Sequence, residues 1–346
     1  IRARMPAEIN EVVIVKYVRL VLLATLSLLA LGAAPARAQI ACVFDIMGAQ
    51  GDVYALARDY ALQARRMGIV LKLRGYTDER VALEDFKAGQ CDAVMMTNLR
   101  GRQLNKFVGT LDSLGSVPSY EMLRSVIGLL MSPKSAARMV SGPYEVVAII
   151  PLGAVYPIVN DRSINTLAKA AGKRIAAFDW DQTQSSLIKQ IGARPVSADI
   201  TNFAGKFNNG QVDIIAAPAM AVRPLELQKG IGTKGAIVNM PFMNITGIMV
   251  IRKDSFNPGD GQLLRSFTSK IQDGAFDLVR RSEADIPPQF WLEVPSYEID
   301  GYKGIMREAR IRLAKQGHYD ATMLRFLKRV LCRYTPEEAE CSLDDE

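Results

Sequence analysis

The stretch ACVFDIM (residues 41–47) opens a segment in which three short apolar runs alternate with two amphipathic ones. The other two apolar runs are IVLKL (69–73) and CDAVMMT (91–97). Between the runs, residues 52–67 and 78–87 repeat apolar side chains at helical spacing. Strand–helix–strand–helix–strand at this spacing predicts parallel pairing and an α/β fold. In a right-handed doubly wound arrangement, the first strand can lie between the second and the third.

The same pattern starts again in the second half of the chain. Two extended apolar stretches connect the two units, at residues 146–159 and 244–252. Two such crossings are what a two-lobed protein with a hinge requires. The second unit is predicted from a helix at 163–171, a strand at 174–178, helices at 182–192 and 201–210 and a strand at 212–217, and the chain ends in helices at 261–281, 302–316 and 321–330.

Residues 16–38 have the layout of a secretory signal peptide. Lys16 and Arg19 precede an apolar run over 20–32, and small residues lead to Ala36-Arg37-Ala38, an A-x-A cleavage site. A permanent transmembrane helix needs about 20 apolar residues, so this run is too short for one. A buried amphipathic helix is the alternative, but the run has almost no polar face. We expect cleavage after Ala38, a translation start near Lys16, and a protein that works outside the cytoplasm.

The composition of residues 39–346 argues against a nucleic-acid-binding protein. The whole chain carries a net charge of +7, and five basic and two acidic residues precede residue 39, which leaves +4. The basic residues are spread along the chain, whereas nucleic-acid binding requires a clustered patch. Hydrophobic residues make up 49% of the chain, enough for a substantial core.

All four cysteines follow the predicted cleavage site. An even number of cysteines in an oxidising compartment predicts two disulfides, with three possible connectivities. We favour Cys332–Cys341, which are close in sequence, and Cys42–Cys91, which begin neighbouring strands. Zinc is an alternative, but the chain has no C-x-x-C motif and one histidine. A lipid on Cys42 is another, although leucine is missing three places upstream.

Ligands of open α/β sheets bind beyond the carboxyl ends of the strands, which selects four loops. We expect Gln50 after the first strand, in a glycine-rich turn that suits an anion. Arg100 after the third strand is a candidate anion clamp. An ordinary turn at 48–52, solvated arginines and a tryptophan plugging its lobe are the alternatives. The full set of expected ligand-binding residues is Gln50, Thr97, Asn98, Arg100, Asp179, Trp180 and Pro218.

Several segments resemble those of periplasmic solute-binding proteins. Residues 163–175 (SINTLAKAAGKRI) are similar to the opening of the second lobe in that class. Residues 192–196 (GARPV) and 207–213 (FNNGQVD) match a pattern of the receptors of TRAP transporters, and residues 86–92 (FKAGQCD) repeat its G-x-x-D step in the first lobe. Their order covers about residues 42–260. More closely, the chain from residue 39 resembles a family of solute-binding proteins of Gram-negative bacteria.

This resemblance implies a type II periplasmic-binding-protein fold with β hinges. It implies lobe 1 at 39–155 with a returning segment at 250–285, lobe 2 at 156–249, and C-terminal helices at 286–346 that pack on the lobes. The implied function is capture of a small anionic or aromatic organic solute in the cleft, with delivery to a membrane permease. We expect a monomer without catalytic residues, metal or cofactor, located in the periplasm.

One departure concerns the binding of a carboxylate. Receptors of TRAP transporters usually carry an arginine within the strand after "G-K", where it pairs with the carboxylate of the substrate. The matching position here is Ala176, and Arg174 lies two residues earlier.

The motif DWDQT (residues 179–183) supports a rival hypothesis. A strand followed by D-x-D-x-T resembles the first motif of haloacid-dehalogenase phosphatases, with Asp179 as nucleophile, Asp181 as general acid/base and Mg²⁺ as cofactor. That motif normally lies near the start of its domain, and no second acidic pair follows here. A third hypothesis is an accessory subunit of an envelope complex that binds no small ligand.

Overall fold

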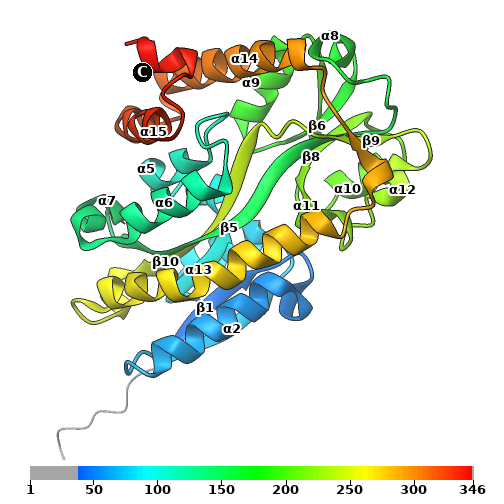
Figure 1. Ribbon diagram of the computed structural model, residues 1–346. Coiled ribbons are helices and arrows are strands. Elements are labelled where there is room, and N and C mark those ends of the chain that lie inside the picture. The colour runs from blue at the N-terminus through cyan, green and yellow to red at the C-terminus, as the bar shows by residue number, and fades with distance from the viewer. Residues whose placement is uncertain (1–37, 345–346) are drawn as a thin grey trace, which may run out of the picture. The chain divides into compact units, whose positions relative to one another are not determined.

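The computed structural model describes residues 38–344 (Figure 1). The predicted signal peptide (16–38) lies outside the described residues except for Ala38, so it stays a prediction. None of the helices within the described residues combines the length and apolar character that a bilayer-spanning helix needs.

The strands of the described residues belong to one mixed sheet. Its main path has the order β2-β1-β3-β10-β5-β8-β6-β7, with β4, β9 and β11 paired off this path. Strand β1 pairs in parallel with both β2 and β3, which confirms the predicted position of the first strand between the other two. The strands are β1 (Gln39–Phe44), β2 (Leu71–Tyr76), β3 (Ala93–Thr97), β4 (Val140–Ser141), β5 (Tyr144–Val159), β6 (Arg174–Phe178), β7 (Arg194–Ala198), β8 (Ile214–Pro218), β9 (Ala236–Val238), β10 (Met243–Arg252) and β11 (Trp291–Leu292).

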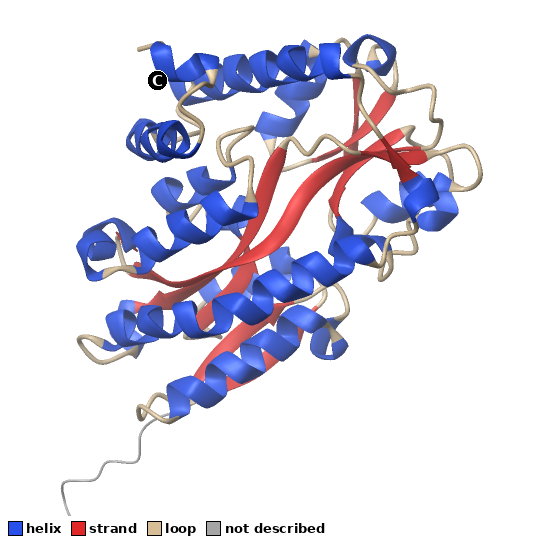
Figure 2. Ribbon diagram, viewed as in Figure 1, coloured by secondary structure: helices blue, strands red, loops and turns tan. Residues whose placement is uncertain are grey.

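The long strand β5 runs through both halves of this sheet (Figure 2): most of it pairs with β10, and its last residues, 155–159, pair with β8. We call the half that contains β1–β3 lobe 1 and the half that contains β6–β8 lobe 2, as in the two-lobe binding-protein fold that the sequence predicts. Gly153 of β5 has φ +111°, a conformation that favours glycine, close to a register shift between β5 and β10. The irregularity lies close to the point where β5 passes from its pairing with β10 to its pairing with β8, and we propose this region as the hinge between the lobes.

Helices cover both faces of the sheet. Strand β3 is buried on both sides, so its alternate residues enter two different cores: Val94 and Met96 one, Ala93 and Met95 the other. Helix α13 lies along β5 and beside α2 (Figure 1). The longer helices are α2 (Asp52–Arg65), α3 (Glu79–Lys87), α6 (Tyr120–Met131), α9 (Gln182–Gln190), α10 (Phe203–Asn208), α13 (Asp260–Ala284), α14 (Ser296–Lys315) and α15 (Ala321–Tyr334).

The remaining helical segments are short. One-turn α-helices are α4 (Asn98–Gly101), α5 (Lys106–Gly109), α7 (Ala136–Met139), α8 (Leu167–Ala170), α11 (Ala219–Val222) and α12 (Gln228–Ile231). The 3-10 turns are η1 (Gly48–Gln50), η2 (Thr110–Asp112), η3 (Pro133–Ser135), η4 (Lys253–Ser255), η5 (Pro288–Phe290) and η6 (Ala339–Ser342).

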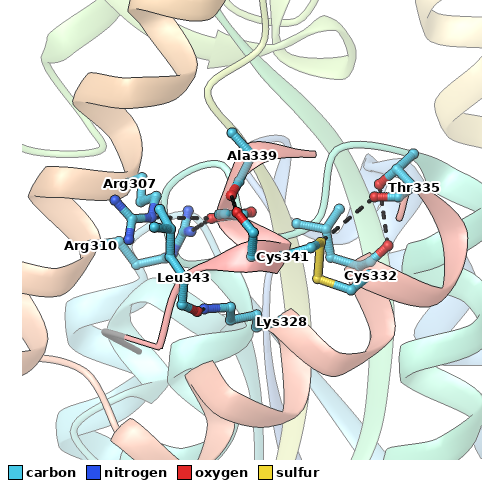
Figure 3. Close-up of a disulfide and its surroundings, with 11 residues drawn as sticks. Arg307, Arg310, Lys328, Cys332, Thr335, Ala339, Cys341 and Leu343 are labelled. Atoms are coloured by element: carbon cyan, nitrogen blue, oxygen red, sulfur yellow. Dashed lines mark hydrogen bonds and ion pairs between the residues drawn. A yellow bond between two sulfur atoms is a disulfide. The ribbon is translucent and has the colours of Figure 1, made fainter. Parts of the chain in front are cut away.

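Both predicted disulfides are present. Cys42 in β1 is bonded to Cys91, which precedes β3, with their Cα atoms 5.9 Å apart. Cys332 at the end of α15 is bonded to Cys341 in η6, with a Cα–Cα distance of 5.6 Å (Figure 3). All four sulfur atoms are therefore engaged in disulfides, which argues against zinc and against a lipid on Cys42.

The second disulfide connects the C-terminal turn η6 to α15. Glu340 of this turn pairs with Arg310 and lies 4.0 Å from Arg307, and Figure 3 shows these two arginines of α14 near the disulfide. Arg310 also donates a hydrogen bond of 2.6 Å to the Leu114 carbonyl of lobe 1. The C-terminal segment thus fixes α14 against lobe 1.

Candidate functional site

A cavity of about 400 Å³ lies at the carboxyl ends of strands from both lobes. Lobe 1 contributes Phe44 and Thr97, at the ends of β1 and β3, and lobe 2 contributes Phe178 and Pro218, at the ends of β6 and β8. Helix α14 adds Tyr302. The volume falls in the range of small-molecule sites, about 300–1,000 Å³. This is the place where the α/β topology predicts a ligand.

The wall of the cavity is mainly apolar. Methionine side chains are flexible and polarisable, and they adapt to the shape of a bound molecule. Aromatic rings offer flat contact area, and tyrosine adds a hydroxyl. These wall residues are Met47, Met95, Met96, Met220, Met240, Met243, Met306, Phe44, Phe178, Phe203, Phe242, Tyr302 and Tyr319.

Glu79, at the start of α3, forms a buried ion pair beside the cavity. One of its carboxylate oxygens lies 3.0 Å from Nε of Arg100, and the other accepts a 2.7 Å hydrogen bond from the Thr97 hydroxyl. Burial raises the pKa of Glu79, and Arg100 opposes the rise. The guanidinium of Arg100 is therefore already neutralised within the protein.

Asp112, at the end of η2, is a fully buried carboxyl in the same wall. It accepts hydrogen bonds from the backbone amide and hydroxyl of Thr246, at 2.9 and 2.7 Å, and from the Asn98 amide at 3.2 Å. No ion pair within residues 38–344 includes it. Burial raises the pKa of Asp112 to about 7.

Tyr319 lies between charged groups of the two lobes. The guanidinium carbon of Arg102, in lobe 1, is 5.0 Å from the centre of the Tyr319 ring. Asp181 in lobe 2 and Arg102 both act electrostatically on the Tyr319 hydroxyl, and burial raises its pKa to about 12. All three side chains belong to the cavity wall. The loop between α14 and α15 thus places the Tyr319 side chain between charged groups of the two lobes.

A known protein family matches this chain over most of its length. The family model described as solute-binding protein AdeT 1/2 matches residues 63–346. The chain belongs to this family. A curated member, "Probable solute-binding protein AdeT1" of Acinetobacter baumannii, is 46% identical over 304 residues, which cover 88% of this chain and 100% of the relative.

Solved structures with the same fold are receptors of TRAP transporters. A TRAP periplasmic solute-binding protein from Desulfovibrio salexigens, with bound orotic acid, has a TM-score of 0.73 at 11% identity, covering 85% of this chain and 98% of that one. A second, from Ralstonia eutropha H16 with bound (S)-2-acetolactate, has a TM-score of 0.71 at 12% identity, covering 87% and 100%. The AdeT 1/2 chain therefore has the predicted two-lobe binding-protein fold.

Three of the residues expected at the ligand lie in the wall of this AdeT 1/2 cavity. They are Gln50 in η1, Thr97 at the end of β3, and Pro218 at the end of β8. Each follows or ends a strand of the parallel units, as the rule on carboxyl ends predicts.

The other four lie outside the cavity wall. Arg100 turns toward Glu79, and Asn98 donates to the Val108 carbonyl and to Asp112 within lobe 1. Asp179 is exposed and accepts a hydrogen bond from the Ser197 hydroxyl on β7. The fourth is Trp180.

Trp180 crosses from lobe 2 to lobe 1. Its ring lies 4.2 Å from the guanidinium carbon of Arg100 and stacks on Phe178 at 5.8 Å. It also packs against the apolar core of lobe 1, and its buried indole nitrogen has no hydrogen-bond partner within residues 38–344. Trp180 is a contact between the lobes.

The position of the usual TRAP arginine carries no charge in this AdeT 1/2 member. Ala176 lies in the wall, as the alignment of motifs expects. Arg174 lies at the opposite end of β6, where its guanidinium pairs with Asp213 at 2.7 Å and holds the pKa of that carboxyl at about 2. Arg174 therefore has a structural partner away from the cavity.

Most polar residues of the wall are not among those that the sequence predicts. The sequence predicts Arg100 at the ligand, but the arginine in the wall is Arg102, two residues later; the turn of α4 sends the two side chains to different places. Tyr302 comes from α14 and Tyr319 from the loop between α14 and α15, and neither follows a strand of the parallel units. No local motif links them to a ligand, and only tertiary packing brings them to the cavity.

The two aspartates of DWDQT lie in different environments. Asp179 is exposed, whereas Asp181 is 5% exposed and caps α9 by accepting from the Thr183 amide at 3.0 Å. Among the described residues, no group of three or more His, Cys, Asp or Glu side chains is placed to hold a metal ion.

Proposed function

We propose that this protein is a periplasmic receptor that captures a small organic solute in the 400 Å³ cavity and delivers it to a membrane permease. The observation that carries the proposal is the composition of the wall, which both lobes and α14 contribute. A ligand that contacts both lobes stabilises their closed arrangement, and a permease can then recognise that arrangement. The apolar and aromatic wall suits a solute with an aromatic or aliphatic body.

Two further observations support this role. The disulfides fit an oxidising compartment such as the periplasm. The structural neighbours hold orotic acid and (S)-2-acetolactate, small organic acids of a size that the cavity could accept. Translocation would use the predicted signal peptide at residues 16–38.

The proposed lobe boundaries follow the hinge. Lobe 1 comprises residues 39–155 and the returning segment 250–285, and lobe 2 comprises residues 156–249. Residues 286–346 form the C-terminal helices that pack on both. We propose that the receptor acts as a monomer and without catalysis, since the two lobes of one chain together form the wall of the cavity.

Thermal-shift screening against pools of organic solutes in metal-free buffer tests this function. Stabilisation by at least one solute, lost when Ala176 in the wall is replaced by Phe, is the expected result, because a ligand that binds the folded state alone raises its melting temperature. A bulky ring at position 176 occupies the cavity from β6. Absence of any stabilising solute would contradict the proposal and favour the ligand-free accessory subunit.

The phosphatase hypothesis has little support, since its two aspartates lie in different environments. It predicts Mg²⁺-dependent hydrolysis of p-nitrophenyl phosphate that disappears in Asp179→Asn. We expect no such activity in either protein.

A further inference from the structure

Most charged side chains of the cavity wall already have polar partners. Asp45 accepts hydrogen bonds from two backbone amides, at 2.7 and 3.1 Å. Glu79 is paired with Arg100, and Asp112 accepts three hydrogen bonds. Asp52 is exposed in the first turn of α2, where water can solvate it. None of these groups needs a ligand to satisfy it.

Two wall side chains keep polar atoms without a partner. Nε of Arg102 donates to the Gly109 carbonyl at 3.4 Å, but no residue between 38 and 344 accepts a hydrogen bond from its two terminal nitrogens. One oxygen of Asp181 accepts from the amide and hydroxyl of Thr183, at 3.0 and 2.5 Å. The other oxygen of Asp181 receives no hydrogen bond from the described residues, although the side chain is only 5% exposed.

These two side chains have opposite charges and come from opposite lobes. Arg102 follows α4 of lobe 1, and Asp181 follows β6 of lobe 2. They form no ion pair with each other among the described residues, and both act on Tyr319. Lobe 1 thus supplies the cavity with a hydrogen-bond donor, Arg102, and lobe 2 supplies it with an acceptor, Asp181.

We propose that the solute is an amino-carboxylate: an apolar or aromatic body that carries a carboxylate bound by Arg102 and an ammonium group bound by Asp181. The inference rests on the proposed function and adds the charge pattern of its ligand. A bidentate hydrogen bond from the guanidinium fits a carboxylate, and an ammonium group can donate to the uncommitted oxygen. Because each charge belongs to a different lobe, such a ligand holds both lobes together.

A ligand with a single charge would leave one of these groups without a partner in a closed, largely apolar cavity. Removal of water from an unpaired charge is unfavourable, so sites of this kind reject ligands that lack one of the polar groups. Specificity for a doubly charged solute follows from the same pair that fixes its orientation. Around those two anchors, the methionine and aromatic side chains accept the body of the solute.

Isothermal titration calorimetry of the purified protein with matched probes tests the inference. One series is phenylalanine, 3-phenylpropanoate and phenethylamine; the other is 4-(aminomethyl)benzoate, 4-methylbenzoate and benzylamine, whose charges are farther apart. We expect at least one zwitterion to bind tenfold or more tightly than both of its singly charged relatives. If the singly charged acid or amine binds as tightly as the zwitterion in both series, the inference is overturned.

Variants assign each charge to its group. Arg102→Gln is expected to remove the advantage over the amine, and Asp181→Asn the advantage over the acid. Asparagine also caps helices, so the fold of α9 is retained in Asp181→Asn. Asp59→Asn is the matched control, an exposed carboxylate on α2 that does not line the cavity, and is expected to leave the affinities unchanged within twofold. Equal losses for all three probes in both variants would indicate a structural role and overturn the assignment.

Failure of this inference and failure of the proposed function give different results. If every solute that stabilises the protein is singly charged, the amino-carboxylate inference is overturned and the receptor function still stands. A protein that no pool and no probe stabilises overturns both.

Discussion

At the scale of single residues, the buried wall carboxyl Asp112 has the clearest consequence. It accepts hydrogen bonds from Asn98 and from the amide and hydroxyl of Thr246, and all three favour the ionised carboxylate. Burial outweighs these hydrogen bonds and raises the pKa of Asp112 to about 7.

Asp112→Asn should change how stability depends on pH. The folded-state pKa of about 7 exceeds the ordinary value of 3.8, so the folded state keeps this proton longer than the unfolded state does. In the wild type, the free energy of unfolding should fall as pH rises from 4 to 7, by up to about 4 kcal/mol from this group. The variant should lack this decline. Urea unfolding of both proteins at pH 5 and pH 8 measures the difference, and parallel pH profiles would contradict the assignment.

The residues of the site were predictable only in part. Of the residues that the rule on strand ends selects, Gln50, Thr97 and Pro218 lie in the wall of the cavity. The choice of Arg100 could not take account of its partner Glu79, which lies 21 residues earlier on another helix. A buried ion pair between distant segments leaves no mark in the local sequence.

At the scale of elements, the fold followed from periodicity where the elements are regular. The alternation over residues 41–97 predicted β1, α2, β2, α3 and β3, and their parallel order. Strand β7 was not predicted, because Pro195 and its half-exposed residues at the edge of the sheet blur the apolar pattern. The segment between β3 and β4 was left unassigned, although Ser119 caps α6 and apolar residues follow at helical spacing.

The hinge in β5 depends on Gly153. At φ +111°, alanine is strained, and a Cβ would also touch Val279 of α13 at 3.4 Å. Gly153→Ala should lower the free energy of unfolding by about 1–2 kcal/mol. Gly128→Ala, on the exposed face of α6 with open space around it, is the control and should stabilise by about 0.5–1 kcal/mol. Denaturant unfolding of the two variants compares them; a neutral effect at Gly153→Ala would contradict the expected backbone strain at this position.

The two disulfides should contribute unequally to stability. Cys42 and Cys91 are 49 residues apart, and Cys332 and Cys341 are nine apart. Loop-closure entropy predicts a loss of about 4 kcal/mol for the paired Cys42/Cys91→Ala variant and about 3 kcal/mol for the Cys332/Cys341→Ala variant. Guanidinium unfolding under non-reducing conditions measures both. A larger loss of stability in the Cys332/Cys341→Ala variant would contradict this order. It would show that α14 depends on η6 more than loop-closure entropy predicts.

At the scale of the whole molecule, two lobes meet around a cavity. Strand β5 runs through both lobes, Trp180 of lobe 2 packs on Arg100 of lobe 1, and α14 contributes to the wall. Sequence predicted the lobes and the C-terminal helices. It could not predict that α14 reaches the cavity, because that depends on where the chain returns after α13.

Trp180→Ala should weaken solute binding without a loss of ligand contacts. The substitution removes a contact between the lobes, so the closed arrangement becomes less populated and the apparent Kd should rise about tenfold, or about 1.4 kcal/mol. Trp180→Phe keeps a ring over Arg100 and should restore most of the affinity. Calorimetric titration with the best solute from the screen measures both variants. An unchanged Kd in Trp180→Ala would show that this contact between the lobes does not contribute to solute binding.

A crystal structure of the protein with the solute that stabilises it most would show directly whether the cavity is the binding site. We expect electron density for that solute inside the cavity, in contact with Arg102 or Asp181 and with the aromatic side chains around Tyr319. Density for the solute at any other place, with the cavity empty, would contradict it.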